Sequence, residues 1–236
     1  MFNRNHTIAA ATIAIATVAG LASPVAAQSG PTCDGQVATI VGTQDDDFII
    51  GTDGPDVIVT LGGDDVIFGE GGDDIICSGQ GDDFVYGGQG ADRIFGQRGG
   101  DVIFGNAPVG ADTPAETTGN FISGGKGNDL VVGDNGDDEL RGGVGHDIVE
   151  GRQGADLVRG GPGDDWVDGA EGADTLRGGK GDDILLVEGP DDVRGGPETN
   201  DQCALLIDTN FASIKGCEDT RRATDSLTAD LRSSRF

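Results

Sequence analysis

The sequence predicts an all-β solenoid built from tandem nine-residue repeats, with two repeats in each coil. Two observations predict it: aspartate recurs every nine residues over most of the chain, and an aliphatic residue follows each of these aspartates two positions later. A third observation sets the coil length, because in the second half of the chain a Gly-Gly pair leads every other unit, which makes the true period eighteen residues. Such a coil divides naturally into two short strands joined by two tight, glycine-rich loops.

The aspartates share one position in the repeat. They are Asp47, Asp56, Asp65, Asp74, Asp83, Asp92, Asp101, Asp129, Asp138, Asp147, Asp156, Asp165, Asp174, Asp183 and Asp191, the last one residue early. The aliphatic residues that follow them are all Ile, Val or Leu: Ile49, Ile58, Ile67, Ile76, Val85, Ile94, Ile103, Val131, Leu140, Val149, Val158, Val167, Leu176, Leu185 and Val193. Because successive strand residues point to opposite faces, we expect one aliphatic side chain per strand to point into a thin core.

The repeats cover residues 42–197 and divide the chain into segments. We expect a signal peptide at 1–27, an N-terminal cap at 28–41, a first repeat block at 42–105, an inserted loop at 106–119, a second block at 120–197, a C-terminal capping hairpin at 198–219 and a mobile tail at 220–236. After the insertion, Asn120 and Ile122 match the aspartate and aliphatic positions of the repeat.

The N-terminus is typical of an export signal. Arg4 precedes an apolar stretch, and Val25-Ala26-Ala27 provides small residues for cleavage near Ala27-Gln28. The stretch is shorter than the roughly twenty residues that a membrane-spanning helix needs. We therefore expect a secreted, extracellular protein with no transmembrane segment in the mature chain.

Four cysteines in an exported chain indicate disulfide bonds, with three connectivities open. Cys203 and Cys217 flank two apolar runs separated by Asp208-Thr209-Asn210, which resembles a hairpin with its ends linked. Cys33 would then pair with Cys77. No Cys-x-x-Cys spacing occurs and the chain has 2 His, so a zinc site is not expected.

The charge of the chain is extreme. It carries 42 Asp+Glu against 15 Lys+Arg, a formal net charge of -27. Repulsion on this scale opposes compaction unless a cation binds the carboxylates. It also argues against nucleic acid as a partner, because the phosphates would be repelled.

The units with a full Gly-Gly pair, such as Gly160-Gly161-Pro162-Gly163-Asp164-Asp165, resemble the RTX (hemolysin-type) nonapeptide repeat, G-G-x-G-x-D-x-U-x with U a large aliphatic residue. The resemblance implies a parallel β-roll with several Ca²⁺ ions between successive coils. Many members of that family carry a separate catalytic or pore-forming domain and an uncleaved C-terminal export signal, and this chain departs from both features.

The chemistry of the repeat supports the same ligand. Tight glycine-rich turns point carbonyl oxygens inward, and an added carboxylate gives the all-oxygen shell that Ca²⁺ prefers and that Mg²⁺, with its stricter geometry, does not. The eighteen-residue period places alternate aspartates on opposite edges, about 4.8 Å apart along each edge. Unit charges at about 5 Å repel by about 3 kcal/mol at an effective dielectric of 20. Repeated along two edges, this exceeds a typical folding stability of about 5–15 kcal/mol, so we expect folding to require the metal.

Two further rows lie at eighteen-residue spacing on outward faces. One is apolar and aromatic: Phe48, Ile50, Val66, Phe68, Phe84, Tyr86, Val102 and Phe104. It either forms an association surface or merely suits a strand, and we favour the second reading. The other row is Arg141, Arg159, Arg177 and Arg194. It either binds an anionic polymer or lipid phosphate or compensates nearby carboxylates, and compensation is the favoured reading.

No catalytic residues are expected. His146 lacks a Ser or Cys partner, and the Asp-Asp doublets recur in many units, whereas an active site would occur once. The sequence favours a secreted calcium-binding repeat protein that folds on binding Ca²⁺ and is not an enzyme. Two alternatives remain open: a calcium-dependent adhesin that contacts a protein or an anionic polysaccharide, and a non-catalytic accessory module of an extracellular enzyme that acts on polysaccharide.

Overall fold

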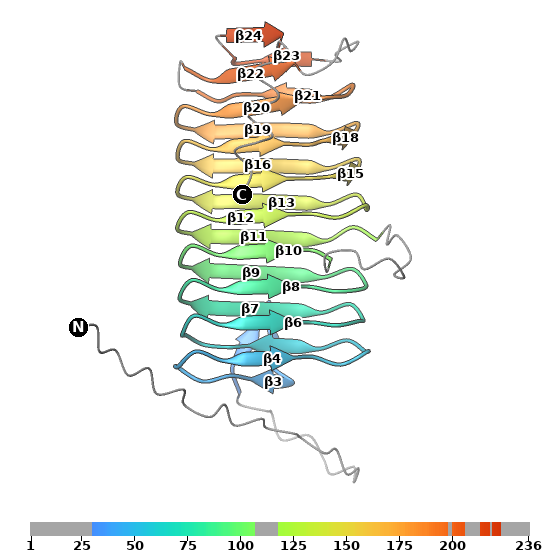
Figure 1. Ribbon diagram of the computed structural model, residues 1–236, viewed down its shortest axis with the longest axis vertical. Helices are drawn as coiled ribbons and strands as arrows, with labels where there is room; N and C mark the ends of the chain where they lie inside the picture. The colour runs from blue at the N-terminus through green and yellow to red at the C-terminus, as the bar shows by residue number, and fades with distance from the viewer. Residues whose placement is uncertain (1–29, 107–117, 198–199, 206–212, 218, 223–236) are drawn as a thin grey trace, which may run out of the picture.

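The computed structural model describes residues 30–106, 118–197, 200–205, 213–217 and 219–222. In this part of the chain every regular element is a strand, and the strands coil into a parallel β-solenoid (Figure 1). The coils form two ten-stranded sheets that lie face to face, with two strands contributed by each turn. The predicted all-β roll with two repeats per coil is confirmed.

The strands of the first sheet, in chain order, are β4 (Phe48–Ile50), β6 (Val66–Phe68), β8 (Phe84–Tyr86), β10 (Val102–Phe104), β12 (Leu130–Val132), β14 (Ile148–Glu150), β17 (Trp166–Asp168), β20 (Ile184–Val187), β22 (Gln202–Leu205) and β24 (Asp219–Arg222). Those of the second sheet are β3 (Ile40–Val41), β5 (Val57–Val59), β7 (Ile75–Gln80), β9 (Arg93–Arg98), β11 (Phe121–Lys126), β13 (Glu139–Val144), β16 (Leu157–Pro162), β19 (Thr175–Lys180), β21 (Asp192–Arg194) and β23 (Ser213–Lys215). A short parallel pair, β15 (Gln153–Gly154) with β18 (Glu171–Gly172), lies in the loops.

The register follows the eighteen-residue period, so that Ile148 pairs with Trp166 and Trp166 pairs with Ile184. Each of these loops contains a position at which the backbone must adopt a positive φ, and glycine occupies it at Gly143 with φ 127°. Gln97 adopts φ 75° at the equivalent position, where it pairs with Gly125. A side chain is strained there.

The core is a stack of aliphatic side chains between the two sheets. Fourteen of the fifteen predicted inward residues are fully buried, and Ile49, in the outermost strand of the first sheet, packs partly buried against them. Ile122, after the insertion, and Cys203, near the C-terminal end, join the same stack. One side chain per strand therefore makes most of this stack, as expected, and Val187 adds a second side chain from β20.

The inserted loop leaves both sheets continuous. β9 pairs with β11 and β10 pairs with β12, so the two predicted blocks pack as one roll. The loop therefore adds residues without breaking the column of coils.

The N-terminal segment lies on the outer face of the second sheet. β1 (Thr32–Cys33) and β2 (Gln36–Val37) form an antiparallel pair, and Cys33 is buried against Val57, Ile75 and Cys77. The predicted Cys33–Cys77 disulfide is confirmed, with 5.8 Å between the Cα atoms. The roll itself begins at Ile40, two residues before the predicted start.

The C-terminal end departs from the sequence prediction, although the Cys203–Cys217 disulfide is confirmed. β22 and β23 do not form a hairpin, because β22 pairs in parallel with β20 in the first sheet and β23 pairs in parallel with β21 in the second. The chain continues coiling here instead of folding back. β24, which includes residues 220–222 of the expected mobile tail, adds a tenth strand to the first sheet. The rest of that tail, and the predicted signal peptide, lie outside the described residues.

Candidate calcium sites

The repeat aspartates form two columns, one along each edge of the roll. In the first column, the backbone N–H of each aspartate donates to the Oδ1 of the aspartate in the next coil: Asp147 N–H to Asp165 Oδ1 at 2.9 Å, and Asp165 N–H to Asp183 Oδ1 at 3.0 Å. The second column repeats this contact, as in Asp156 N–H to Asp174 Oδ1 at 2.9 Å. Each rung, meaning one aspartate or asparagine of a column, is thus tied to the next through a side-chain oxygen.

The first column comprises Asp47, Asp65, Asp83, Asp101, Asp129, Asp147, Asp165, Asp183 and Asp201. The second comprises Asp56, Asp74, Asp92, Asn120, Asp138, Asp156, Asp174 and Asp191. Sequence reasoning missed Asp201 because it follows Asp191 by ten residues and precedes an inward cysteine instead of an aliphatic residue. Its spacing of eighteen from Asp183 was the available signal.

The second carboxylate oxygen of most column members is buried without a hydrogen-bond partner. This holds for Oδ2 of Asp65, Asp74, Asp83, Asp92, Asp101, Asp129, Asp147, Asp156, Asp165, Asp174 and Asp183. Buried anionic oxygens are ordinarily paired, because leaving one unpaired costs several kcal/mol. A repeated set of orphaned carboxylate oxygens therefore indicates that a cation completes the structure.

Most of these oxygens face the space beside a loop glycine, together with a carbonyl oxygen of the next coil. A Cβ atom built on Gly142 would lie 2.5 Å from Asp147 Oδ2 and 2.8 Å from the carbonyl oxygen of Gly160, one coil further on. The same point beside Gly160 lies 2.5 Å from Asp165 Oδ2 and 2.8 Å from the Gly178 carbonyl oxygen. Oxygens from two successive coils therefore converge beside each of these glycines, and carboxylate and carbonyl oxygens are the ligands that Ca²⁺ prefers.

No group of three or more His, Cys, Asp or Glu side chains is gathered around one point among the described residues. This agrees with the geometry above, in which a single carboxylate meets backbone carbonyl oxygens. Such a donor set is hard and all-oxygen, and it suits Ca²⁺ far better than a transition metal.

Burial makes the metal-free columns poor anions. The pKa of Asp74, Asp92 and Asp174 is raised from an ordinary 3.8 to about 7, mainly by desolvation and in smaller part by neighbouring carboxylates. The backbone N–H bonds to Oδ1 oppose part of this rise in each case. Without a cation, the columns would hold protons near neutral pH.

Four predicted ligands have Oδ2 already engaged. Asp47 Oδ2 accepts from Thr43 N–H, Asp56 Oδ2 from Thr52, Asp138 Oδ2 from Asp134 N–H and Asp191 Oδ2 from Gly189 N–H. These rungs lie at the first turns of the roll, after the insertion and at the shortened last unit. The donor set is therefore weaker at the irregular repeats.

Asn120 makes one rung different in kind. Its Oδ1 accepts from Asp92 N–H at 2.8 Å, which orients the amide so that Nδ2 lies 2.7 Å from the Cβ position of Gly105. Nδ2 donates to the buried Asp134 Oδ2 at 3.1 Å. An amide NH₂ group thus occupies the place where the other rungs direct an orphaned oxygen. The Asp134 carboxylate beside it is satisfied by this amide without a cation.

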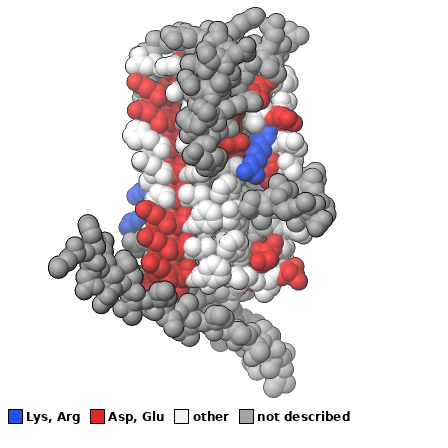
Figure 2. Space-filling model, in the orientation of Figure 1, with Lys and Arg blue, Asp and Glu red and all other residues white. Residues whose placement is uncertain are grey.

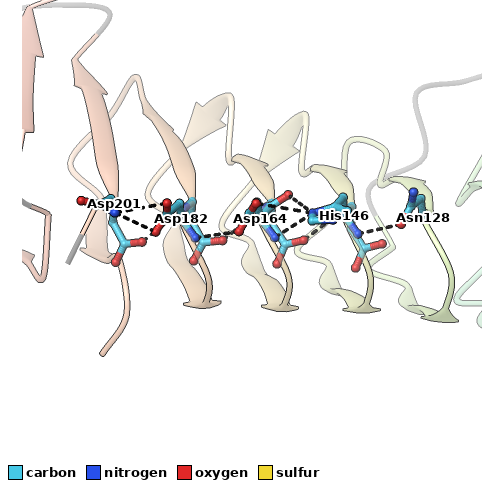
Figure 3. A network of polar contacts seen from close by, with 9 residues as sticks. Asn128, His146, Asp164, Asp182 and Asp201 are labelled. Carbon is cyan, nitrogen blue, oxygen red and sulfur yellow. Dashed lines mark hydrogen bonds and ion pairs between the residues drawn. The ribbon is translucent and has the colours of Figure 1, made fainter. Parts of the chain in front are cut away.

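A second ladder lies outside the first column, one residue before each column aspartate (Figure 3). His146 N–H donates to Asn128 Oδ1 at 2.9 Å, and Asp164 N–H donates to His146 Nδ1 at 3.0 Å. Asp182 N–H donates to Asp164 Oδ1 at 2.9 Å. These side chains are exposed, so His146 serves as one link of a surface ladder. Figure 2 shows acidic side chains gathered in a column along one side of the roll.

The comparisons with known proteins agree with this geometry. The model of the RTX calcium-binding nonapeptide repeat (4 copies) matches residues 41–76, 50–85, 78–107, 116–149 and 150–185, which together make up more than half of the chain. A search of curated proteins found no match to the chain. No helix in the described part of the chain is long and apolar enough to cross a membrane.

Proposed function

Because the chain belongs to the family of RTX calcium-binding nonapeptide repeat proteins, we propose that it is an exported protein whose folding is coupled to binding of Ca²⁺ along both aspartate columns. The observation that carries the proposal is the set of eleven buried, unpartnered Oδ2 atoms among the described residues. A fold that buries so many anionic oxygens gains little from its thin core unless a cation is part of it.

The residues that would hold the ions are the column aspartates with orphaned Oδ2 atoms, together with carbonyl oxygens of the loop glycines. Bound Ca²⁺ supplies positive charge between carboxylates that otherwise repel. The loops do the rest: glycines at positive φ admit the backbone to the site, and the Oδ1 bonds hold each carboxylate in place. Since each coil contacts only its neighbours, binding at one rung favours order at the next.

Export would bring the chain to an environment in which folding coupled to Ca²⁺ binding is useful. The predicted signal peptide would direct the chain to a compartment where both disulfides persist. Extracellular calcium modules bind at about 10⁻⁴–10⁻³ M. We propose that the chain stays unfolded at low calcium during export, folds outside the cell and carries no catalytic activity of its own.

Far-UV circular dichroism of the mature chain, residues 28–236, tests the proposal. Calcium titrated from excess chelator to millimolar concentration should convert a coil spectrum into a β spectrum, and equal concentrations of Mg²⁺ should not. A full β spectrum in chelator at neutral pH would refute the coupling. Equal folding in Mg²⁺ would refute the selectivity.

A second candidate function, a calcium-dependent adhesin, is favoured by the aromatic row on the first sheet. Ring centroids lie 5.8 Å apart for Phe48–Phe68, 5.3 Å for Phe68–Tyr86 and 5.1 Å for Tyr86–Phe104, and Phe48 is 61% exposed. Attachment of the labelled protein to cells in calcium should then fall for Phe48→Ser with Phe68→Ser. It should persist for Ile148→Ser, which removes an exposed apolar side chain elsewhere on the sheet. The accessory-module alternative would instead require polysaccharide-cleaving activity that co-purifies with the chain.

A further inference from the structure

The outer face of the second sheet carries a row of five cations, one on each of five successive strands. Register pairs Arg141 with Arg159, Arg159 with Arg177, Arg177 with Arg194 and Arg194 with Lys215. With strands about 4.8 Å apart, the row spans roughly 19 Å along the roll. In a chain with 15 Lys+Arg against 42 Asp+Glu, this is a marked concentration of positive charge.

Neighbouring carboxylates compensate only part of the row. Glu139 Oε1 accepts from Arg141 at 2.7 Å and from Arg159 at 2.9 Å, so one carboxylate serves two guanidinium groups. Asp192 Oδ2 lies 3.5 Å from Arg194. Within the described residues, neither Arg177 nor Lys215 forms an ion pair, and the buried Nε of Arg177 has no hydrogen-bond partner. Five cations thus face two carboxylates. Charge compensation, which the sequence analysis favoured, therefore accounts for only part of the row.

The row is accessible. The side chains of Arg141 and Arg194 are 47% and 48% exposed. Among the described residues, the N-terminal segment lies against the same face at β5, β7 and β9, where Cys33 packs against Val57 and Ile75 and Asp34 pairs with Arg93. The cations stand along one line further up this face.

From this arrangement we infer that the row binds a linear acidic polysaccharide, a chain of sugars that bears a carboxylate at regular intervals. A guanidinium fork matches a carboxylate in two parallel hydrogen bonds. Cations repeated in a line favour a polymer whose charges also repeat in a line, because each further contact is made within an already bound chain. The inference rests on the calcium-folded roll of the proposed function, since only the folded coils bring these residues into register.

Two other polyanions fit the face less well. A flat anionic membrane would also meet the exposed acidic loops that border the sheet, with Asp137 on one edge and Asp164 and Asp182 on the other, and would be repelled by them. Single-stranded nucleic acid binds through aromatic side chains on which bases stack. The positions beside Arg159 and Arg177 are Leu157 and Thr175, which offer no ring.

Binding of an end-labelled oligogalacturonate, too short to gel with calcium, to the mature protein in millimolar calcium tests the inference. Fluorescence anisotropy should show binding that weakens as NaCl is added, and a neutral oligosaccharide of equal length should not bind. Arg159→Gln with Arg177→Gln should weaken binding at least about tenfold. The control, Arg98→Gln with Lys126→Gln, makes the same change in net charge on exposed cations at the edge of the same sheet and should bind like the parent.

A gain-of-binding variant sharpens the test. Glu139 Oε1 accepts from both Arg141 and Arg159, so this carboxylate competes for the row. Glu139→Gln should therefore tighten oligogalacturonate binding. Circular dichroism of each sample separates the two proposals. A roll that folds without calcium would refute the proposed function, but oligogalacturonate binding could still be measured on it. No binding by the folded parent, equal losses in the row and control variants, or equally tight binding of single-stranded DNA or anionic vesicles would overturn the inference.

Discussion

The neighbouring residues Asp164 and Asp165 allow a matched test of the calcium columns. They lie in one loop, and each Oδ1 accepts a backbone N–H from a loop eighteen residues away: Asp182 N–H for Asp164 and Asp147 N–H for Asp165, both at 2.9 Å. Replacement by Asn keeps this acceptor and removes one negative charge in either case. The two sites differ in Oδ2, which is buried without a partner in Asp165 and belongs to an exposed side chain in Asp164.

The expected effects differ accordingly. Asp165→Asn directs an NH₂ group at the point where Asp165 Oδ2 and the Gly178 carbonyl oxygen converge, and so repels the ion. An ion bound only by the folded state contributes about 1.4 kcal/mol at ten times its Kd, a ratio that millimolar calcium reaches for a Kd of about 10⁻⁴ M. We expect a loss of about that size in millimolar calcium. Asp164→Asn should change the free energy of unfolding by no more than about 0.5 kcal/mol.

Urea unfolding of both variants and the parent in millimolar calcium, followed by circular dichroism, measures the difference. The calcium midpoint of folding should rise for Asp165→Asn and stay near the parent value for Asp164→Asn. Equal losses in the two variants would show that total charge controls folding and that the orphaned oxygens do not.

Four further predictions follow from the same geometry. The folded-state pKa of about 7 for Asp74, Asp92 and Asp174 lies above the ordinary 3.8, so acid should stabilise the metal-free roll and this stability should be lost as the pH rises through about 7. In chelator the β signal should grow between pH 7.5 and 4.5, while the calcium midpoint should rise over the same range because protons compete; a pH-independent midpoint would contradict this. Asn120→Asp replaces the amide with an oxygen and should add one bound Ca²⁺ by calorimetric titration, whereas an unchanged stoichiometry would contradict the metal-free rung. Gln97→Gly should stabilise the roll by roughly 0.5–1 kcal/mol in urea unfolding, because glycine tolerates the φ of 75° there, and a loss would show that the Gln97 side chain makes a needed contact. Peptide mapping of the secreted protein without reduction should recover Cys33–Cys77 and Cys203–Cys217, and free thiols would exclude both bonds.

Much of the roll could be predicted because each coil repeats the same residue pattern. The position of an aspartate in the nine-residue repeat decides its edge, and the residue two positions later decides the core. Hence Ile58 and Leu185 are buried as expected, and Asp147 stands between Asp129 and Asp165. Because the coils stack in parallel with a fixed offset of eighteen residues, each residue's neighbours in the next coil follow from its position in the sequence. The sequence by itself therefore determined the fold class, the register and the composition of both columns at the regular repeats.

The tertiary structure decided what happens where the repeat is broken or where two coils meet. Whether an aspartate keeps a free oxygen depends on a neighbour in space, as Asp134 shows beside both Asn120 and Asp138. The same holds at the ends: the segment around Cys33 lies on a sheet face, and β22 and β23 continue the coil where the sequence predicted a hairpin. The number of carboxylates that face the cation row also depends on side-chain reach between strands, since Glu139 serves arginines on two of them. Periodicity specifies the partners along a column, but hydrogen bonds, burial and ion pairs are properties of the assembled coils.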